Sequence, residues 1–129
     1  KVVAAGGERI NLHAYWDGRI SGLGSDMDPR AFAAELQQGI SATQRALWRN
    51  SALLDWAEES KQLRDEVYAF PAPAAGQRAV LDDDYAEKAI SIISLRLSQA
   101  GVRLAGMLDE VFCVASTDAL SPVAADIPR

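Results

Sequence analysis

The chain contains one cysteine and one histidine among its 129 residues, and it has no long run of hydrophobic side chains. A single cysteine, Cys113, excludes an internal disulfide framework and a zinc site built from several thiolates. Its neighbours are apolar, so we expect a buried side chain rather than a reactive thiol. No segment approaches the roughly 20 apolar residues that a transmembrane helix needs, so we expect no membrane span.

Basic residues are also scarce, because 13 Lys and Arg stand against 18 Asp and Glu, for a formal net charge of −5. A protein that holds nucleic acid through its phosphates usually presents a basic face. If this chain acts on nucleic acid, the positive charge must come from elsewhere, and a bound metal ion is one such source. Hydrophobic residues at 49% and charged residues at 24% are ordinary for a folded domain and exclude a disordered chain.

Helical periodicity dominates the rest of the sequence and predicts an all-α fold. Asn11 is suited to cap a first helix, which we expect to end before Gly18. Asp28 followed by Pro29 is typical of another helix start. The expected helices span 12–16, 29–40, 41–50, 51–68 and 84–112, with a strand fragment or loop at 1–9, loops at 21–28 and 70–76, and an extended or frayed tail at 116–129.

The two long predicted helices differ in how much apolar surface they carry. In the helix over 51–68, Leu53, Trp56 and Leu63 belong to an approximate inner stripe. The helix over 84–112 has apolar residues at three- and four-residue spacing and a second apolar side, which predicts burial around most of its circumference. The other predicted helices cannot cover that much surface, so we expect further protein to pack against it.

The single histidine, His13, lies four residues before Asp17 on the first predicted helix. This spacing puts both side chains on one helix face, with Cβ atoms about 5–6 Å apart. An imidazole nitrogen and a carboxylate oxygen so placed can bind one divalent metal, and these ligands suit zinc. The spacing fits a surface ion pair as well, because a closed zinc site needs three or four protein ligands and no obvious third is present.

Other catalytic arrangements are absent from the sequence. There is no Gly-x-Ser-x-Gly motif of a serine hydrolase, no P-loop and no Gly-x-Gly-x-x-Gly. The acidic run 82–84 precedes a predicted helix, where negative charge favours the positive end of the helix dipole. These absences leave the pair of His13 and Asp17 as the candidate for chemistry.

Three blocks of the chain carry a family resemblance. Residues 11–17 match the pattern Asn-Leu-His-x-x-Trp-Asp, and residues 56–60 match Trp-Ala-x-Glu-Ser. Residues 81–108 form the third block, with Tyr85 near its start. All three resemble the S1/P1 nuclease family of zinc-dependent single-strand nucleases and 3′-nucleotidases, and their order and spacing fit that family over most of residues 1–112.

The resemblance implies a helical domain similar to the phospholipase C/P1 nuclease fold, with one or two long buried helices and three zinc ions per intact domain. It implies a hydrolase that cleaves phosphodiester bonds in single-stranded DNA or RNA with the help of these metals, with 3′-nucleotides as further candidate substrates. It also implies an exported protein, secreted or periplasmic. By the same resemblance, His13 and Asp17 correspond to two of the zinc ligands.

Four further residues receive expected roles near the metals. Tyr15 is a candidate for stacking on a nucleobase, with a supporting role in the core as the alternative. Asn11 and Trp16 are candidates to orient the ligands. Glu59 is a candidate for the same role, or else it bonds a backbone group or an arginine.

The sequence departs from the family in one respect. The N-terminal Trp and the earlier His and Asp ligands of the family have no counterpart. We therefore expect residues 1–129 to be the C-terminal portion of a single S1/P1 nuclease-like domain that is inactive alone. Its expected partners are the N-terminal half of the same protein, single-stranded nucleic acid or nucleotides, and another copy of the fragment. The alternatives are a phospholipase C-like zinc hydrolase and a non-catalytic helical interaction module.

Overall fold

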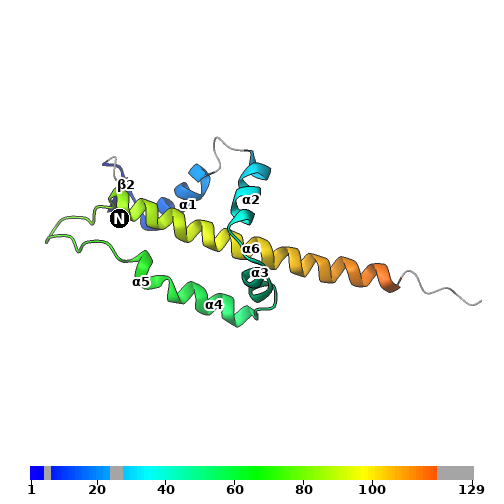
Figure 1. Ribbon diagram of the computed structural model, residues 1–129. Helices are drawn as coiled ribbons and strands as arrows, with labels where there is room; N and C mark the ends of the chain where they lie inside the picture. The colour runs from blue at the N-terminus through cyan, green and yellow to red at the C-terminus, as the bar shows by residue number, and fades with distance from the viewer. Residues whose placement is uncertain (5–6, 24–27, 119–129) are drawn as a thin grey trace, which may run out of the picture.

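One long helix, α6 (Asp83–Asp118), runs through the molecule, and the other elements pack along it (Figure 1). The computed structural model describes residues 1–4, 7–23 and 28–118, with the backbone alone for residues 19–23 and 113–118. The α6 helix begins where Asp82 Oδ1 accepts the Tyr85 backbone N–H at 2.9 Å. The predicted all-α fold class is confirmed. The side chain of Cys113, which was expected to be buried, lies outside the described part of the structure.

The N-terminal residues form a small antiparallel pair of strands, β1 (Val2–Val3) and β2 (Arg9–Ile10). The first strand also pairs with the segment that leads into α6. Val3 donates its backbone N–H to Ala79 O at 2.9 Å, and Leu81 donates to Val3 O at 2.8 Å. These bonds hold the start of the chain beside the N-terminal end of α6.

The next helix, α1 (Leu12–Leu23), is longer than predicted. Asn11 Oδ1 accepts the Ala14 backbone N–H at 2.7 Å, which confirms the N-cap. The predicted end before Gly18 is wrong. A glycine inside a helix costs only about 1 kcal/mol, which packing of the preceding turn against α6 can outweigh. Of the predicted loop over 21–28, residues 21–23 are helical and 24–27 lie outside the described residues.

Local capping contacts begin the next two helices; the cap at Asp28 was predicted from the sequence, and the one at Ser41 was not. In α2 (Pro29–Gln38), Asp28 caps the first turn through a bond to the Ala31 N–H. In α3 (Ala42–Arg49), Ser41 and Gln44 form a reciprocal capping box. Both helices pack across the middle of α6.

The predicted helix over 51–68 is two helices, α4 (Leu53–Gln62) and α5 (Arg64–Val67). The break falls at Leu63, where there is neither glycine nor proline. Trp56 and Leu63 of the predicted inner stripe are partly buried, but Leu53 is 70% exposed and was wrongly assigned to it. The structure therefore has one long helix and not two.

Burial is concentrated at the N-terminal half of α6. The core consists of side chains from β1, α1, the segment before α6 and the first turns of α6: Val2, Tyr15, Ala79, Leu81, Tyr85 and Ala89. Ile92, Ile93 and Val102 are also buried along α6. The expectation of burial around most of the helix therefore holds for much of this half, but not for Leu95, which is 41% exposed.

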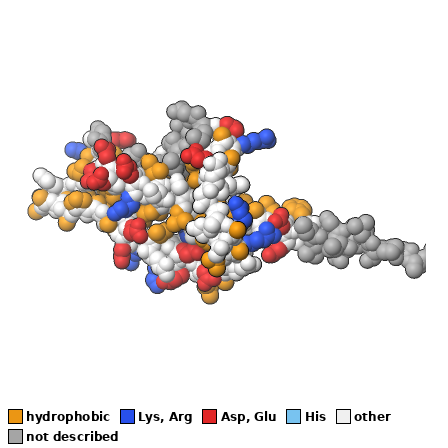
Figure 2. Space-filling view, viewed as in Figure 1, with side chains coloured by type: hydrophobic (Ala, Val, Ile, Leu, Met, Phe, Trp, Pro, Cys, Tyr) orange, Lys and Arg blue, Asp and Glu red, His pale blue; other side chains and the backbone are white. Residues whose placement is uncertain are grey.

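The C-terminal half of α6 extends beyond the other helices (Figure 1). Its exposed hydrophobic residues, here called the apolar stripe, are Leu104, Met107, Leu108, Val111 and Phe112, each 46–66% exposed. Hydrophobic side chains are visible on this projecting part in Figure 2. The helix continues to Asp118, so the tail predicted from residue 116 is helical over 116–118, and residues 119–129 lie outside the described part. No described helix is long and apolar enough to cross a bilayer.

Candidate metal centre

His13 and Asp17 lie together on the outer face of α1. His13 Nε2 is 3.3 Å from Asp17 Oδ2, the contact expected for side chains one helical turn apart. Their side chains are 90% and 62% exposed. The pair therefore presents a nitrogen and an oxygen donor to the outside of the described structure.

The opposite side of α1 is anchored in the core. Tyr15 is 4% exposed, and Trp16 is partly buried. Both rings pack against Tyr85 of α6, with centroid distances of 5.9 Å for Tyr15 and 6.3 Å for Trp16. Phe70 adds an edge contact to Tyr85 at 5.9 Å. We call Tyr15, Trp16, Phe70 and Tyr85 the aromatic cluster.

The hydroxyl of Tyr85 joins three helices. It donates to the backbone carbonyl of Val67, at the end of α5, at 2.6 Å. It accepts the indole Nε1–H of Trp16, on α1, at 3.1 Å. Burial raises the pKa of the Tyr85 hydroxyl, so the group stays neutral and keeps the proton that it donates. The aromatic cluster thus combines ring packing with two directed hydrogen bonds.

The position of Tyr15 bears on its two expected roles. A ring that is 4% exposed and packed against Tyr85 offers no free face to a nucleobase in the described structure. Its surroundings are those of a core support for α1. The ring of Trp16 is similarly engaged, through its edge-on contact and its bond to the Tyr85 hydroxyl.

Glu59 lies in a separate cluster between α4 and α6. Its Oε2 accepts from Arg96 Nη1 at 2.7 Å, and its Oε1 accepts from Arg103 Nη2 at 2.6 Å. We call Glu59, Arg96 and Arg103 the arginine clamp. Glu59 thus bonds two arginines, as one of its two expected roles requires.

The two arginines of the arginine clamp also donate hydrogen bonds to neutral side chains. Arg96 also donates to the hydroxyl of Ser60 and the side-chain oxygen of Gln99, and Arg103 donates to the hydroxyl of Ser51. The guanidinium of Arg103, 4% exposed, lies 4.9 Å from the centre of the Trp56 ring.

The charges of the arginine clamp affect the titration of its carboxyl group. The hydrogen bond from Arg103 is the main cause that lowers the pKa of Glu59, with Arg96 assisting and burial opposing. The carboxylate therefore stays ionised to lower pH than usual. Neither Arg96 nor Arg103 was predicted from the sequence. Two arginines seven residues apart on the same face of an otherwise apolar helix were the signal available.

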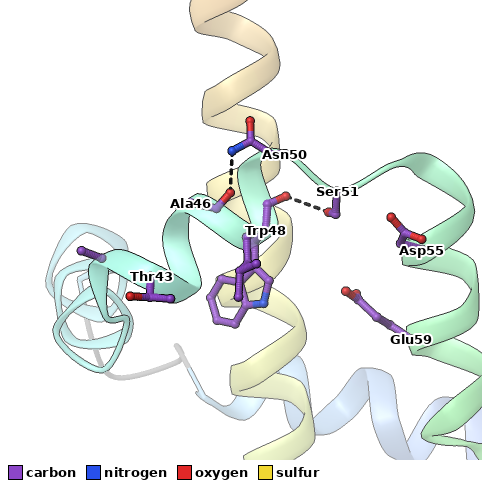
Figure 3. A pocket seen from close by; sticks show the side chains of 9 residues that line it. Thr43, Ala46, Trp48, Asn50, Ser51, Asp55 and Glu59 are labelled. Atoms are coloured by element: carbon purple, nitrogen blue, oxygen red, sulfur yellow. Dashed lines mark hydrogen bonds between the residues drawn. The ribbon is translucent and has the colours of Figure 1, made fainter.

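Several pockets border these clusters. A shallow one of about 950 Å³ between α3 and α4 is lined by Trp48, Asp55 and Glu59, among others, and two side-chain hydrogen bonds to backbone carbonyls lie beside it (Figure 3). A smaller one of about 350 Å³ is mainly apolar and has Trp16 and Arg96 in its wall. Neither His13 nor Asp17 lines either pocket.

The side chains of His13 and Asp17 could supply two ligands of a zinc ion. Imidazole nitrogen and carboxylate oxygen are zinc ligands, and both point away from the core. Within the described residues, no group of three His, Cys, Asp or Glu side chains is placed to hold a metal ion. A closed site needs at least one more protein ligand than the described residues bring together.

Comparison with known proteins decides the family. The sequence model of the S1/P1 nuclease family, described as S1/P1 Nuclease, matches residues 1–113. The chain belongs to the S1/P1 nuclease family. None of the curated proteins and none of the solved structures compared with the chain matches it.

Family membership gives the arrangement a chemical context. S1/P1 nucleases are hydrolases of phosphodiester bonds, and the family is generally zinc-dependent. The match covers α1 with His13 and Asp17, which we call the metal pair because they are the candidate ligands, α4 with Glu59, and α6 through the aromatic cluster and the arginine clamp. It agrees with the mostly helical fold and with the family resemblance of the sequence.

Proposed function

We propose that the protein to which this chain belongs hydrolyses phosphodiester bonds in single-stranded DNA or RNA, and also acts on 3′-nucleotides, in a zinc-dependent reaction. In this proposal His13 and Asp17 are two of the zinc ligands. The observation that supports it is their placement: two adjacent donors, 3.3 Å apart, face outward from a helix whose other side is fixed in the core.

The residues of this chain hold and orient the metal. His13 supplies a nitrogen donor, and Asp17 supplies a negative oxygen donor one turn later. Asn11 caps the helix that carries them, and Trp16 anchors it to α6. Bound zinc would act as a Lewis acid toward phosphate oxygens and would supply the positive charge that a chain of net charge −5 lacks.

The other ligands must come from outside the described residues, because two protein donors are too few for a stable zinc site. We propose that residues 1–129 are the C-terminal portion of one S1/P1 nuclease domain. Three zinc ions would then lie between this portion and the preceding part of the same protein. On this proposal the 129-residue chain alone has no nuclease activity.

The apolar stripe supports the same proposal from another direction. Five large hydrophobic side chains on successive turns of α6 are each at least 46% exposed. Leaving apolar area in water costs about 25 cal/mol for each Å². We propose that the remainder of the nuclease domain covers this stripe.

Export from the cell, to the periplasm or the medium, is part of the same proposal and is supported by family membership alone.

The test uses the protein expressed from its full-length gene. We expect cleavage of single-stranded DNA or RNA well above cleavage of duplex DNA, release of phosphate from a 3′-nucleotide, loss of both with a chelator, and recovery with zinc. Phosphatidylcholine, offered as a substrate in parallel, should remain intact. Hydrolysis of the lipid without cleavage of nucleic acid would favour the phospholipase C-like alternative. No zinc-dependent hydrolysis of any of these substrates would contradict the proposal.

A further inference from the structure

Tyr85 is a central contact between α6 and α1. Its ring packs against Tyr15 and Trp16, and its hydroxyl accepts the indole N–H of Trp16. We propose that Tyr85 is a positioning residue for the metal pair, which fixes the rotation of α1 about its axis and thereby the direction of His13 and Asp17. This inference rests on the proposed function.

Helix geometry connects the two sides of α1. At 3.6 residues per turn, His13 and Asp17 share one face, Tyr15 lies on the opposite face, and Trp16 lies on the flank beside His13. The exposures agree, since Tyr15 is 4% exposed and His13 is 90% exposed. A helix is stiff over this length, so a turn of the inner face would swing both metal ligands by the same angle.

The hydroxyl adds a direction that ring packing alone does not supply. Its proton is committed to the Val67 carbonyl at 2.6 Å, and this orients an oxygen lone pair toward Trp16. The indole N–H then has one favourable angle of approach to that lone pair, at 3.1 Å. Val67, Tyr85 and Trp16 thus form a chain from α5 through α6 to α1. The end of this chain is next to Asp17 in sequence.

The decisive variant is Tyr85→Phe in the full-length, zinc-loaded protein. It keeps a ring of similar shape in the aromatic cluster and removes both hydrogen bonds. Partners that orient metal ligands are typically worth 10–100-fold in metal affinity or activity. Because Tyr85 acts through Trp16, we expect the lower end. Zinc transfer to a chelator should be about tenfold faster, and kcat should fall by a similar factor with little change in KM.

Two further variants separate positioning from a general loss of stability. Tyr68→Phe removes a hydroxyl from a neighbouring ring that is 60% exposed, and it should leave zinc release and kcat unchanged. Trp16→Phe removes the donor of the same bond, and it should resemble Tyr85→Phe. The effect of the double variant Trp16→Phe/Tyr85→Phe should be smaller than the two single effects combined, because the bond between Trp16 and Tyr85 is lost in all three variants.

The reference variant His13→Ala keeps this test distinct from the test of function. If His13→Ala loses zinc while Tyr85→Phe releases zinc at the wild-type rate, positioning by Tyr85 is overturned and the proposed function stands. If His13→Ala retains zinc and turnover, the proposed function itself fails. If Tyr85→Phe does not fold, Trp16→Phe decides: a wild-type rate of zinc release in that variant overturns the inference.

Discussion

The α6 helix holds its two flanking helices by different physical means. At its N-terminal end the aromatic cluster holds α1 through ring packing and neutral hydrogen bonds. Further along, the arginine clamp holds α4 through two charged bonds from Arg96 and Arg103 to Glu59. One helix surface thus carries an uncharged attachment and a charged attachment, ten to twenty residues apart along the chain.

The difference assigns different tasks to the two attachments. The aromatic cluster contacts the helix that carries His13 and Asp17, and in our proposal its geometry determines where these two side chains point. The arginine clamp fixes the position of α4 and touches neither His13 nor Asp17 by any described hydrogen bond or ion pair. We therefore expect damage near the aromatic cluster to appear in metal binding and turnover, and damage to the arginine clamp to appear in stability.

The largest expected effect is loss of activity on removal of a ligand. In the full-length protein, His13→Ala and Asp17→Ala should each lower kcat by more than the roughly 100-fold that partners of metal ligands cost, with less change in KM. The helical circular dichroism should be unchanged, because both side chains are mostly exposed. The matched control is Glu35→Ala, an exposed acidic residue on α2, which should retain full activity. Near-normal turnover in both ligand variants would contradict the assignment.

The next effect is on stability. Glu59→Ala leaves Arg103, 4% exposed, without its carboxylate, and breaking a buried ion pair in this way costs about 3 kcal/mol. Urea denaturation should show this loss, while the folded variant should keep its zinc and its kcat. Glu58→Ala is the control, because the ion pair of Glu58 with Lys61 is on the surface and worth less than about 1 kcal/mol. Equal losses in the two variants would show that the arginine clamp adds no more than a surface pair.

A smaller effect concerns the apolar stripe. The 129-residue chain expressed alone should self-associate, because Leu104 and Val111 are 57% and 65% exposed among the described residues. The variant Leu104→Gln/Val111→Gln should weaken this association about tenfold, equivalent to about 1.4 kcal/mol. Leu53→Gln/Leu54→Gln changes two residues that are more exposed, at 70% and 82%, but lie off the stripe, and it should have no effect. Sedimentation of the unaltered chain as a single monomeric species at all concentrations would overturn the expectation.

The smallest effect is the pH dependence that the arginine clamp introduces. Arg103 and Arg96 hold the pKa of Glu59 below its ordinary value of 4.5, so the carboxylate contributes stability above that pH. This contribution is lost as the pH falls through the lowered pKa of the folded state. The advantage of the wild type over Glu59→Gln in free energy of unfolding should therefore be constant from neutral pH to 4.5 and should shrink below it. An advantage that persists unchanged to about pH 3 would contradict the lowered pKa.

Local signals in the sequence predicted the elements whose ends depend on neighbouring residues. Asp28 with Pro29 was recognised as a helix start, and α2 follows from it. The capping box of Ser41 and Gln44 acts within one turn as well, but it was not recognised in the sequence, where only a helical segment over 41–50 was predicted. The length of α1 could not be predicted in this way. Its glycine at position 18 is tolerated because Tyr15 and Trp16 are held by a side chain about 70 residues away.

The break at Leu63 and the arginine clamp were also beyond local signals. No glycine or proline marks Leu63, and the sequence shows only an uninterrupted helical pattern there. Glu59 was noticed as part of a family motif, but its two partners come from α6, 37 and 44 residues later. The spacing of His13 and Asp17 predicted their contact, because that contact lies within one helix.

The zinc content of the purified full-length protein tests the central claim most directly. The intact mass of the protein should first be verified. Its zinc content should then be measured by inductively coupled plasma emission spectrometry in the wild type, His13→Ala, Asp17→Ala and the Glu35→Ala control. We expect about three zinc ions per wild-type and control molecule, and fewer in each ligand variant while the helical content is preserved. Full zinc content in both ligand variants would contradict the assignment of His13 and Asp17 as ligands.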